Sequence, residues 1–383
     1  MGPLIIIGTG LSGYNLAREF RKLDTGRKVI LITTDDGRNY YKPDLSAGFT
    51  KGKTAEELVR DQLEVMEDTL KVEIRIATTV QGVDVRNQVV RLGGDHTLEY
   101  DDLVFAIGAD TIKLPLQGNG LDRVYSVNDL MDYGKFRRVL QGKKKVLIIG
   151  AGLIGCEYSN DLSNGGFSVE VVDPLPQVLP LLLPEPSAKA VQQGLESLGV
   201  KFHLGGALVK TVNQSGEGVE VGLSDGQKLF ADVVLSAVGL RPRIQLAQGC
   251  GLKVNRGIVV NRKLQTSVPN VYALGDCAEV EGQVLLYVLP LMAAAKALAK
   301  TLAGEPTDVV YGAMPVSIKT PVCPIVVSPP PKNLEGQWEY EGTAPHLKAL
   351  FRDRSGKLQG FALTGDATKQ RVAVTKEMPP ILA

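Results

Sequence analysis

The sequence LIIIGTGLSGYNLAREF, at residues 4–20, joins a short apolar run to three glycines in the spacing Gly-x-Gly-x-x-Gly. The same pattern returns in KVLIIGAGLIGCEYSNDL, at residues 145–162. The glycines are Gly8, Gly10 and Gly13 in the first copy and Gly150, Gly152 and Gly155 in the second. Each apolar run predicts a buried parallel strand, and the residues after each turn have helical spacing. The chain therefore contains two strand–turn–helix units.

A turn of this kind is suited to a dinucleotide. The first glycine permits a tight bend, the second lets the backbone approach a pyrophosphate, and the third lets the helix pack on the strand. The helix N-terminus then offers free N–H groups to the phosphates. Thr9, Leu11, Ser12, Leu153 and Ile154, within the two turns, are further cofactor-binding candidates. Two such turns predict two dinucleotide sites, and such a pair favours electron transfer between a flavin and a nicotinamide.

Acidic residues follow both turns at the distance expected for a ribose contact. Asp35 stands 22 residues after Gly13, and Asp173 stands 18 residues after Gly155. A carboxylate there accepts hydrogen bonds from ribose hydroxyls. Thr33 and Thr34 are competitors for the first ribose, and we retain Thr34 as a candidate. Asp173 would repel a 2′-phosphate and no arginine lies within residues 173–183, so we expect NADH rather than NADPH.

Composition sets limits on what the protein binds and where it works. The 383 residues are 44% hydrophobic and 22% charged, with a net charge of +1, which indicates two or three globular domains and no nucleic-acid partner. The longest apolar run, Leu285–Ala295, is far short of the roughly 20 residues needed to span a bilayer, so we expect no membrane insertion. Four scattered cysteines without a Cys-x-x-Cys pair, and no basic leader, favour the cytoplasm and give no metal site.

The pattern along the chain predicts four segments. They are a dinucleotide-binding domain in two parts at residues 1–110 and 238–308, a second one at 111–237, and a small C-terminal domain at 309–383. The first part ends in FAIGA, in which Gly108 is a cofactor candidate. Predicted helices are 11–23, 54–70, 188–198, 289–302 and a short one at the C-terminus. Predicted strands are 5–7, 29–32, 72–76, 80–85, 88–92, 97–100, 103–107, 146–149, 169–172, 233–239, 316–319 and 325–327, with a hairpin turning at 354–356.

A third motif, TSVPNVYALGD at residues 266–276, makes the pattern specific. With the two glycine turns it resembles the class of FAD- and NAD(P)H-dependent flavoprotein reductases. That resemblance implies an α/β protein with two Rossmann-like three-layer dinucleotide-binding domains, as in glutathione reductase, plus a small α+β C-terminal domain. It also implies that Asp276, with Gly275, contacts the ribityl chain of FAD. The paired cysteines of disulfide reductases are absent, and no cysteine lies near residue 40 as in NADH oxidases.

Two further segments resemble the branch of this class that reduces rubredoxin in alkane-degrading bacteria. They are Lys42-Pro43-Asp44-Leu45-Ser46 and the short tail containing Ser-Ile-Lys319-Thr. The resemblance implies that Lys42 reaches the flavin near N5 and that Glu157 pairs with Lys42. A fixed cation at that position stabilises the negative charge that develops on the ring. Resemblance alone also suggests Val80 at the adenine, and Val288 and Lys319 near the flavin.

These features together predict an NADH-dependent reductase that passes electrons through FAD to rubredoxin, in an alkane hydroxylation chain. Two alternatives remain open. One is an NADH-dependent ferredoxin reductase of the same fold, and the other is a redox-sensing protein that binds FAD and NADH. The short tail and the lack of long insertions or basic runs argue against the sensor.

Overall fold

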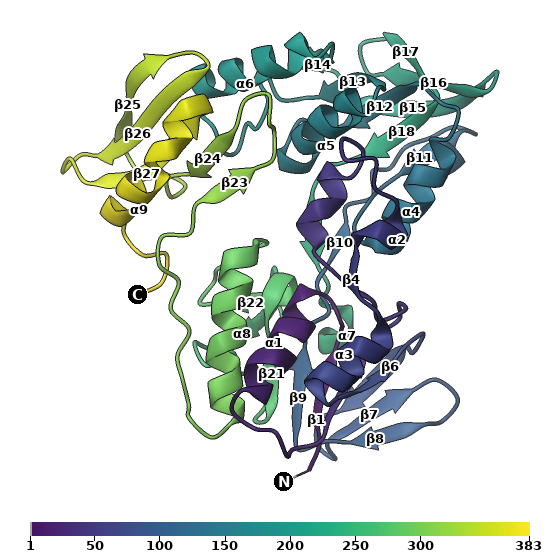
Figure 1. Cartoon of the computed structure of the whole chain (residues 1–383), viewed down its shortest axis with the longest axis vertical. Coiled ribbons are helices and arrows are strands. Elements are labelled where there is room, and N and C mark those ends of the chain that lie inside the picture. The colour runs from purple at the N-terminus through teal and green to yellow at the C-terminus, as the bar shows by residue number, and fades with distance from the viewer. Residues whose placement is uncertain (1) are drawn as a thin grey trace.

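The first glycine turn follows the central strand of a five-stranded parallel sheet. The computed structural model describes residues 2–383 (Figure 1). The strand order is β21 (Val271–Ala273), β9 (Asp102–Phe105), β1 (Leu4–Ile7), β2 (Val29–Ile32) and β5 (Glu73–Arg75). Every residue of β1 and β2 is buried, as a continuous apolar run in a covered parallel sheet requires.

Helices and a small antiparallel sheet enclose this first parallel sheet. Helix α1 (Leu11–Arg21) contacts both α8 (Val288–Leu302) and α3 (Leu63–Leu70), and Figure 1 shows α1 and α8 side by side. The antiparallel strands are β6 (Val80–Asp84), β7 (Val89–Leu92) and β8 (Thr97–Glu99). Apolar residues of β6 and β7 belong to the same buried cluster as β1. We refer to these elements as the first unit.

The second unit repeats this plan around another parallel sheet. Its strand order is β11 (Val124–Tyr125), β18 (Val233–Ser236), β12 (Lys145–Ile149), β13 (Ser168–Asp173) and β14 (Lys201–Leu204). Its helices are α4 (Leu130–Val139), α5 (Leu153–Asn164) and α6 (Glu185–Ser197), and its antiparallel strands are β15 (Val209–Ser215), β16 (Gly218–Leu223) and β17 (Lys228–Ala231). Alternate residues of β12 enter two different buried clusters: Val146 and Ile148 pack with the helices, whereas Leu147 and Ile149 pack with β15–β17. The sheet is therefore the middle of three layers.

The C-terminal unit is an antiparallel sheet with a terminal helix, α9 (Arg371–Glu377). The strand order is β23 (Val316–Ile318), β24 (Ile325–Ser328), β27 (Leu358–Thr364), β26 (His346–Asp353) and β25 (Gly336–Thr343). Strand β27 contacts α6, and Ile318 and Cys323 share a buried cluster with Val191 and Leu195 of α6. The C-terminal unit therefore packs directly against the second unit.

Short elements connect these units. They are β3 (Asn39–Tyr40), 3-10 helix η1 (Lys42–Ala47), α2 (Ala55–Leu58), β4 (Val59–Asp61), β10 (Ala109–Thr111), η2 (Leu121–Arg123), β19 (Leu240–Pro242), α7 (Gln245–Gly249), β20 (Ile258–Val260), η3 (Gly275–Cys277), β22 (Ala278–Val280) and η4 (Gly365–Gln370). Strands β10 and β19 pair antiparallel where the chain leaves and re-enters the first unit. No helix within residues 2–383 has the length and apolar character needed to cross a bilayer.

The predicted fold class is confirmed, but several elements differ from prediction. The helix expected over residues 54–70 is broken, because β4 leaves the helical path to pair with β3. Sequence reasoning missed α4, whose residues include Gly134 and several charges. It also missed β25, because the strand GQWEYEGT lies at a sheet edge and only its Trp338 is partly buried.

Candidate functional site

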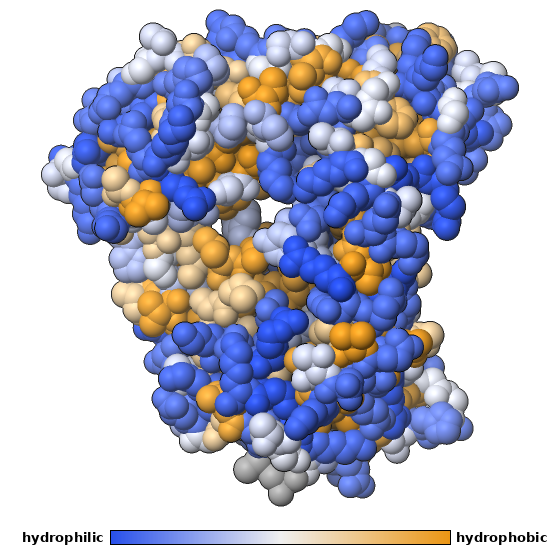
Figure 2. All heavy atoms as spheres, in the orientation of Figure 1, coloured by the Kyte–Doolittle hydropathy of each residue, from blue (hydrophilic) through white to orange (hydrophobic). Residues whose placement is uncertain are grey.

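A cavity of about 2040 Å³ lies where the three units meet. Figure 2 shows this face of the molecule hollowed near its centre, with hydrophobic residues gathered around the hollow. Both glycine turns line the cavity, as do residues of η1, of the segment after β23 and of α9. Its volume exceeds the roughly 300–1,000 Å³ of an ordinary small-molecule pocket, and it is large enough for two dinucleotides.

In the first glycine turn, two glycines are required by the fold and one borders the space open to a ligand. Gly8 has φ +114°, and a Cβ there would approach the Ala106 carbonyl oxygen to 2.3 Å. A Cβ on Gly13 would lie 1.9 Å from the Gly8 carbonyl oxygen, so this glycine lets α1 pack on β1. Gly10 lines the cavity, and a Cβ there would meet no heavy atom within 4 Å. The open space at Gly10 is the room that a pyrophosphate needs.

The second turn repeats this geometry. Gly150 has φ +106° and lies against the Ala237 carbonyl, and a Cβ on Gly155 would lie 1.9 Å from the Gly150 carbonyl oxygen. Gly152 again borders open space in the cavity. Glycine caps both α1 and α5, and neither cap supplies a side-chain hydrogen bond. The first N–H groups of both helices therefore remain available to a phosphate.

The two predicted ribose acids stand beside the turns and line the cavity. Asp35 Oδ1 accepts hydrogen bonds from Thr33 Oγ1 at 2.7 Å, from the Gly37 N–H at 2.9 Å and from Thr9 Oγ1 at 3.1 Å. Asp173 accepts from the Ala151 N–H at 2.7 Å and from the Leu175 N–H at 2.8 Å. Each carboxylate is thus fixed to the loop around its glycine turn.

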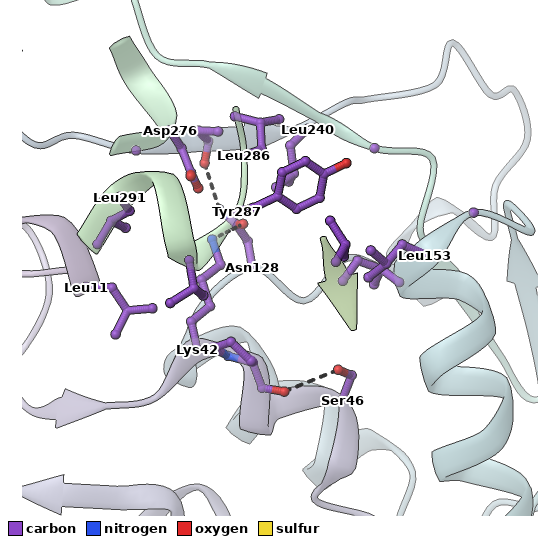
Figure 3. Close-up of a pocket in the computed structure, with 18 of the residues that line it drawn as sticks. Leu11, Lys42, Ser46, Asn128, Leu153, Leu240, Asp276, Leu286, Tyr287 and Leu291 are labelled. Carbon is purple, nitrogen blue, oxygen red and sulfur yellow. Dashed lines mark hydrogen bonds between the residues drawn. The ribbon is translucent and has the colours of Figure 1, made fainter. Parts of the chain in front are cut away.

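Lys42 lies in the cavity close to Asn128 and Asp276. Its Nζ donates to Asn128 Oδ1 at 2.8 Å, and Asn128 Nδ2 donates to the Ala109 carbonyl oxygen at 2.9 Å. Figure 3 shows Lys42 extended toward Asn128, with Asp276 and Tyr287 nearby. Burial lowers the pKa of Lys42, against the opposing effect of the Asp276 carboxylate. Burial likewise raises the pKa of Asp276, and the Lys42 charge opposes this shift.

The predicted pair between Lys42 and Glu157 is wrong in this structure. Glu157 forms its ion pair with Lys319 Nζ, and its Oε1 accepts the Lys319 backbone N–H at 2.8 Å. Ser46 Oγ donates to Glu157 Oε2 at 2.5 Å. The Lys42 side chain extends to Asn128, whereas Lys319, directly after β23, lies next to Glu157 on α5.

Most of the other sequence candidates also border the cavity. They include Leu11, Ser12, Thr34, Val80, Gly108, Leu153, Ile154 and Val288. Three predicted glycines, Gly13, Gly155 and Gly275, do not line it. Gly275 has φ +75°, and a Cβ there would come within 1.9 Å of Ser12 Oγ. Behind the cavity wall, Gly13 and Gly155 therefore allow close backbone packing, and Gly275 makes room for the Ser12 side chain.

Asn128 and Arg243 are among the polar residues of the cavity wall that sequence reasoning missed. Asn128, the partner of Lys42, stands in a short loop before α4, and no motif surrounds it. Arg243 follows β19, and its guanidinium donates to Asp110 at 2.7 Å and to the Ile107 carbonyl at 2.9 Å. Both lie near the point where the chain passes between the units, so only the tertiary structure identifies them.

Comparison with known proteins agrees with this arrangement. The family described as pyridine nucleotide-disulphide oxidoreductase matches residues 2–301, and the rubredoxin binding C-terminal domain matches residues 308–378. A rubredoxin-NAD(+) reductase of Alcanivorax borkumensis is 55% identical over 383 residues, which cover 100% of both chains. Another, from Acinetobacter baylyi, is 43% identical and covers 100% of this chain and 99% of its own.

A solved structure gives independent support for the fold. The ferredoxin reductase for the CYP199A2 system of Rhodopseudomonas palustris superposes with a TM-score of 0.89 at 24% identity, covering 99% of this chain and 96% of that chain. The predictions of an oxidoreductase and of FAD and NADH as cofactors are confirmed by the family match and by the relatives. This chain belongs to the pyridine nucleotide-disulphide oxidoreductase family.

Proposed function

We propose that this protein is an NADH-dependent reductase that delivers electrons through FAD to rubredoxin. The observation that carries the proposal is one cavity bordered by three things: the first glycine turn, the second glycine turn, and the unit that matches a rubredoxin binding domain. NADH, FAD and rubredoxin can then meet at one cavity, so no moving part of the protein has to carry electrons between separate sites.

The FAD would occupy the first turn and the NADH the second. Residues proposed for FAD are Gly8, Thr9, Gly10, Leu11, Ser12, Thr34, Asp35, Lys42, Val80, Gly108, Glu157, Asp276, Val288 and Lys319 from the cavity wall, with Gly13 and Gly275 behind it. Those proposed for NADH are Gly150, Gly152, Leu153, Ile154 and Asp173 from the wall, with Gly155 behind it. We propose that residues 1–110 and 238–308 form the FAD-binding domain, residues 111–237 the NADH-binding domain and residues 309–383 the C-terminal domain.

The chain contributes binding, orientation and charge to this reaction. Bound FAD supplies the exchange between a two-electron hydride and single electrons. Lys42 places a cation in the cavity, hydrogen-bonded to the neutral Asn128 amide. A fixed cation there stabilises negative charge that develops during hydride transfer without the need to reorganise solvent.

The acceptor would approach the side of the cavity formed by α8 and α9. Leu289 and Val372, on these two helices, are 51% and 59% exposed and line the cavity. Arg371 and Lys376 of α9 line it as well. Exposed apolar groups bordered by cations suit a small acidic electron carrier that binds weakly and leaves quickly.

Steady-state reduction of purified rubredoxin by NADH, compared with ferredoxin across a salt series, tests the acceptor. We expect rubredoxin to be the better acceptor at low salt, and its rate to fall as salt rises, because opposite charges steer the encounter. A rate for rubredoxin no better than that for ferredoxin at every ionic strength would refute rubredoxin as the acceptor. It would leave the FAD- and NADH-dependent reductase in place.

We also propose a cytoplasmic location and a role in alkane hydroxylation. Cys156, Cys250, Cys277 and Cys323 are free thiols, as is usual in a reducing compartment. The alkane pathway rests on the resemblance of the Lys42 segment and the tail alone. Growth of a deletion strain on alkanes, with and without the restored gene, tests this role.

A further inference from the structure

Glu157 is a buried carboxylate that joins the second unit, the C-terminal unit and the connecting helix η1. It belongs to α5 of the second unit and is only 1% exposed. Ser46, which donates to it, belongs to η1, the connecting helix that begins at Lys42 and packs against α5. Lys319, which gives it both a backbone N–H and an ammonium, follows β23 of the C-terminal unit. All three side chains line the cavity.

The position of Lys319 is set by its backbone and not only by its long side chain. Two successive turns of α5 hold its segment: Glu157 accepts the Lys319 N–H at 2.8 Å, and Asn160 Oδ1 accepts the Val322 N–H at 3.2 Å. The buried Thr320 hydroxyl donates to the Cys323 carbonyl at 2.8 Å and closes the loop. Lys319 is therefore a fixed part of the cavity wall.

The charges in the cavity explain why this contact matters. An ionised carboxylate buried without a partner is strongly unfavourable. Lys42 does not serve as that partner here: its Nζ hydrogen-bonds Asn128, and Glu157 pairs with Lys319. Within residues 2–383, the one ion pair formed by Glu157 is with Lys319. The C-terminal unit thus supplies the positive charge that balances an acid of the dinucleotide cavity.

We propose that Lys319 is a positioning residue that makes the flavin site depend on the C-terminal unit. By neutralising and orienting Glu157, it keeps an unbalanced negative charge away from the flavin. This inference rests on the proposed function only in placing the flavin and NADH in the cavity, and it does not depend on rubredoxin as acceptor. Without Lys319, the negative charge of the Glu157 carboxylate would destabilise the reduced, electron-rich flavin. The reduction potential of the flavin would fall, and the reduction of the flavin by NADH would slow.

Full-length Lys319→Met, Lys319→Arg and Lys357→Met variants, each loaded with FAD, test the proposal. Methionine keeps the length of the side chain without the charge, arginine keeps the charge, and Lys357 is an exposed residue of the same unit with no ion pair in the described chain. We measure the flavin midpoint potential and the anaerobic rate of flavin reduction against NADH concentration. Lys319→Met should lower the potential and slow the limiting rate by about tenfold, the loss expected for one charge-assisted hydrogen bond, with little change in NADH affinity. Lys319→Arg should recover most of the potential and rate that Lys319→Met loses, and Lys357→Met should resemble the wild type.

A double-mutant cycle with Glu157→Gln separates positioning from a general structural role. If Lys319 acts through the charge of Glu157, Lys319→Met should have little further effect in the Glu157→Gln background. Additive effects in the cycle, or an unchanged potential and rate in Lys319→Met, would overturn the proposal. If Lys319→Met fails to fold or to retain FAD, the comparison of Glu157→Gln with the double variant decides, because both lack the buried charge. All these measurements use NADH and flavin alone, so failure with rubredoxin is a separate result.

Discussion

The two glycine turns share one backbone geometry, but the helices that follow them are used differently. In both, the first glycine has a positive φ. The third glycine lets the helix pack close to the turn, because a Cβ there would collide with the carbonyl oxygen of the first glycine. Helix α1 keeps several polar side chains at its surface, whereas most of α5 is buried. The same turn thus begins one helix that covers a sheet and another that lies at the centre of the molecule.

One pair of equivalent positions shows the difference. Asn15 and Glu157 both stand two residues after the third glycine. Asn15 Nδ2 donates to the Leu11 carbonyl of its own helix at 2.7 Å, while Glu157 bonds to Ser46 of η1 and to Lys319 of the C-terminal unit. Two turns of the same geometry are thus followed by side chains with different partners.

Valine at the second glycine of each turn should separate the two sites most strongly. Gly10 has φ −65° and Gly152 has φ −75°, values that any residue adopts, and both face open space. We expect Gly10→Val to fold without FAD. Gly152→Val should keep its yellow flavin but bind NADH roughly 100-fold more weakly, as for losing about 3 kcal/mol of charge-assisted hydrogen bonding to the pyrophosphate. Flavin absorbance and NADH titration measure the two effects.

Thermal unfolding of both apoproteins is the control for this pair, since neither substitution should change the apoprotein's stability much. A fully flavin-loaded Gly10→Val protein would mean that the first turn does not hold FAD. Loss of flavin from Gly152→Val instead would exchange the two assignments.

The two acids offer a weaker version of the same contrast. Asp173→Ala should raise the KM for NADH by about tenfold and reduce the preference over NADPH, because one charged hydrogen bond is worth ~1.5–3 kcal/mol. Asp35→Ala should instead weaken FAD retention and leave the KM for NADH of the loaded protein nearly unchanged. Steady-state kinetics with both nucleotides measures the first effect and FAD titration the second. A wild-type preference for NADPH would contradict the role given to Asp173.

The smallest expected effect is a pH dependence that comes from Lys42. Burial lowers the pKa of Lys42 below its ordinary value of 10.5. As pH rises through the lowered value, the folded protein loses this cation while the unfolded chain still holds the proton. The contribution of Lys42 to stability therefore rises with pH in that range, whereas flavin reduction should slow severalfold.

Stopped-flow measurements of flavin reduction by NADH, from neutral to alkaline pH, test for this decrease in rate in the wild type and in Lys42→Arg. Arginine keeps its charge across the range, so the rate of Lys42→Arg should not decrease. The same decrease in rate in both proteins would mean that another group titrates.

The sequence was most informative where local structure and function coincide. The strands before both glycine turns are continuous apolar runs, and the turns allow few alternative conformations, so β1, β2, β12 and α1 were predicted closely. Most residues proposed for the cofactors belong to such motifs, and most of them line one cavity.

The sequence was least informative where a contact joins distant elements. The bond from Lys42 to Asn128 spans 86 positions, and that from Lys319 to Glu157 spans 162. No spacing rule relates residues whose proximity depends on how β10, β19 and β23 orient whole units. A charged residue in a motif thus indicated a role, while its partner was available only from the tertiary structure.

The strand order of the first sheet also constrains how the protein matures during synthesis. Strand β21 pairs with β9, although the entire second unit lies between them in the chain. Asp276 and α8 follow later still. The second unit can close its parallel sheet as soon as β18 leaves the ribosome, because its strands lie within one continuous segment. The first unit must wait, with its edge at β9 unpaired, until most of the chain has been made. We therefore expect flavin to be incorporated only after the second unit has formed, and the nascent protein to carry an open sheet edge at β9 until then.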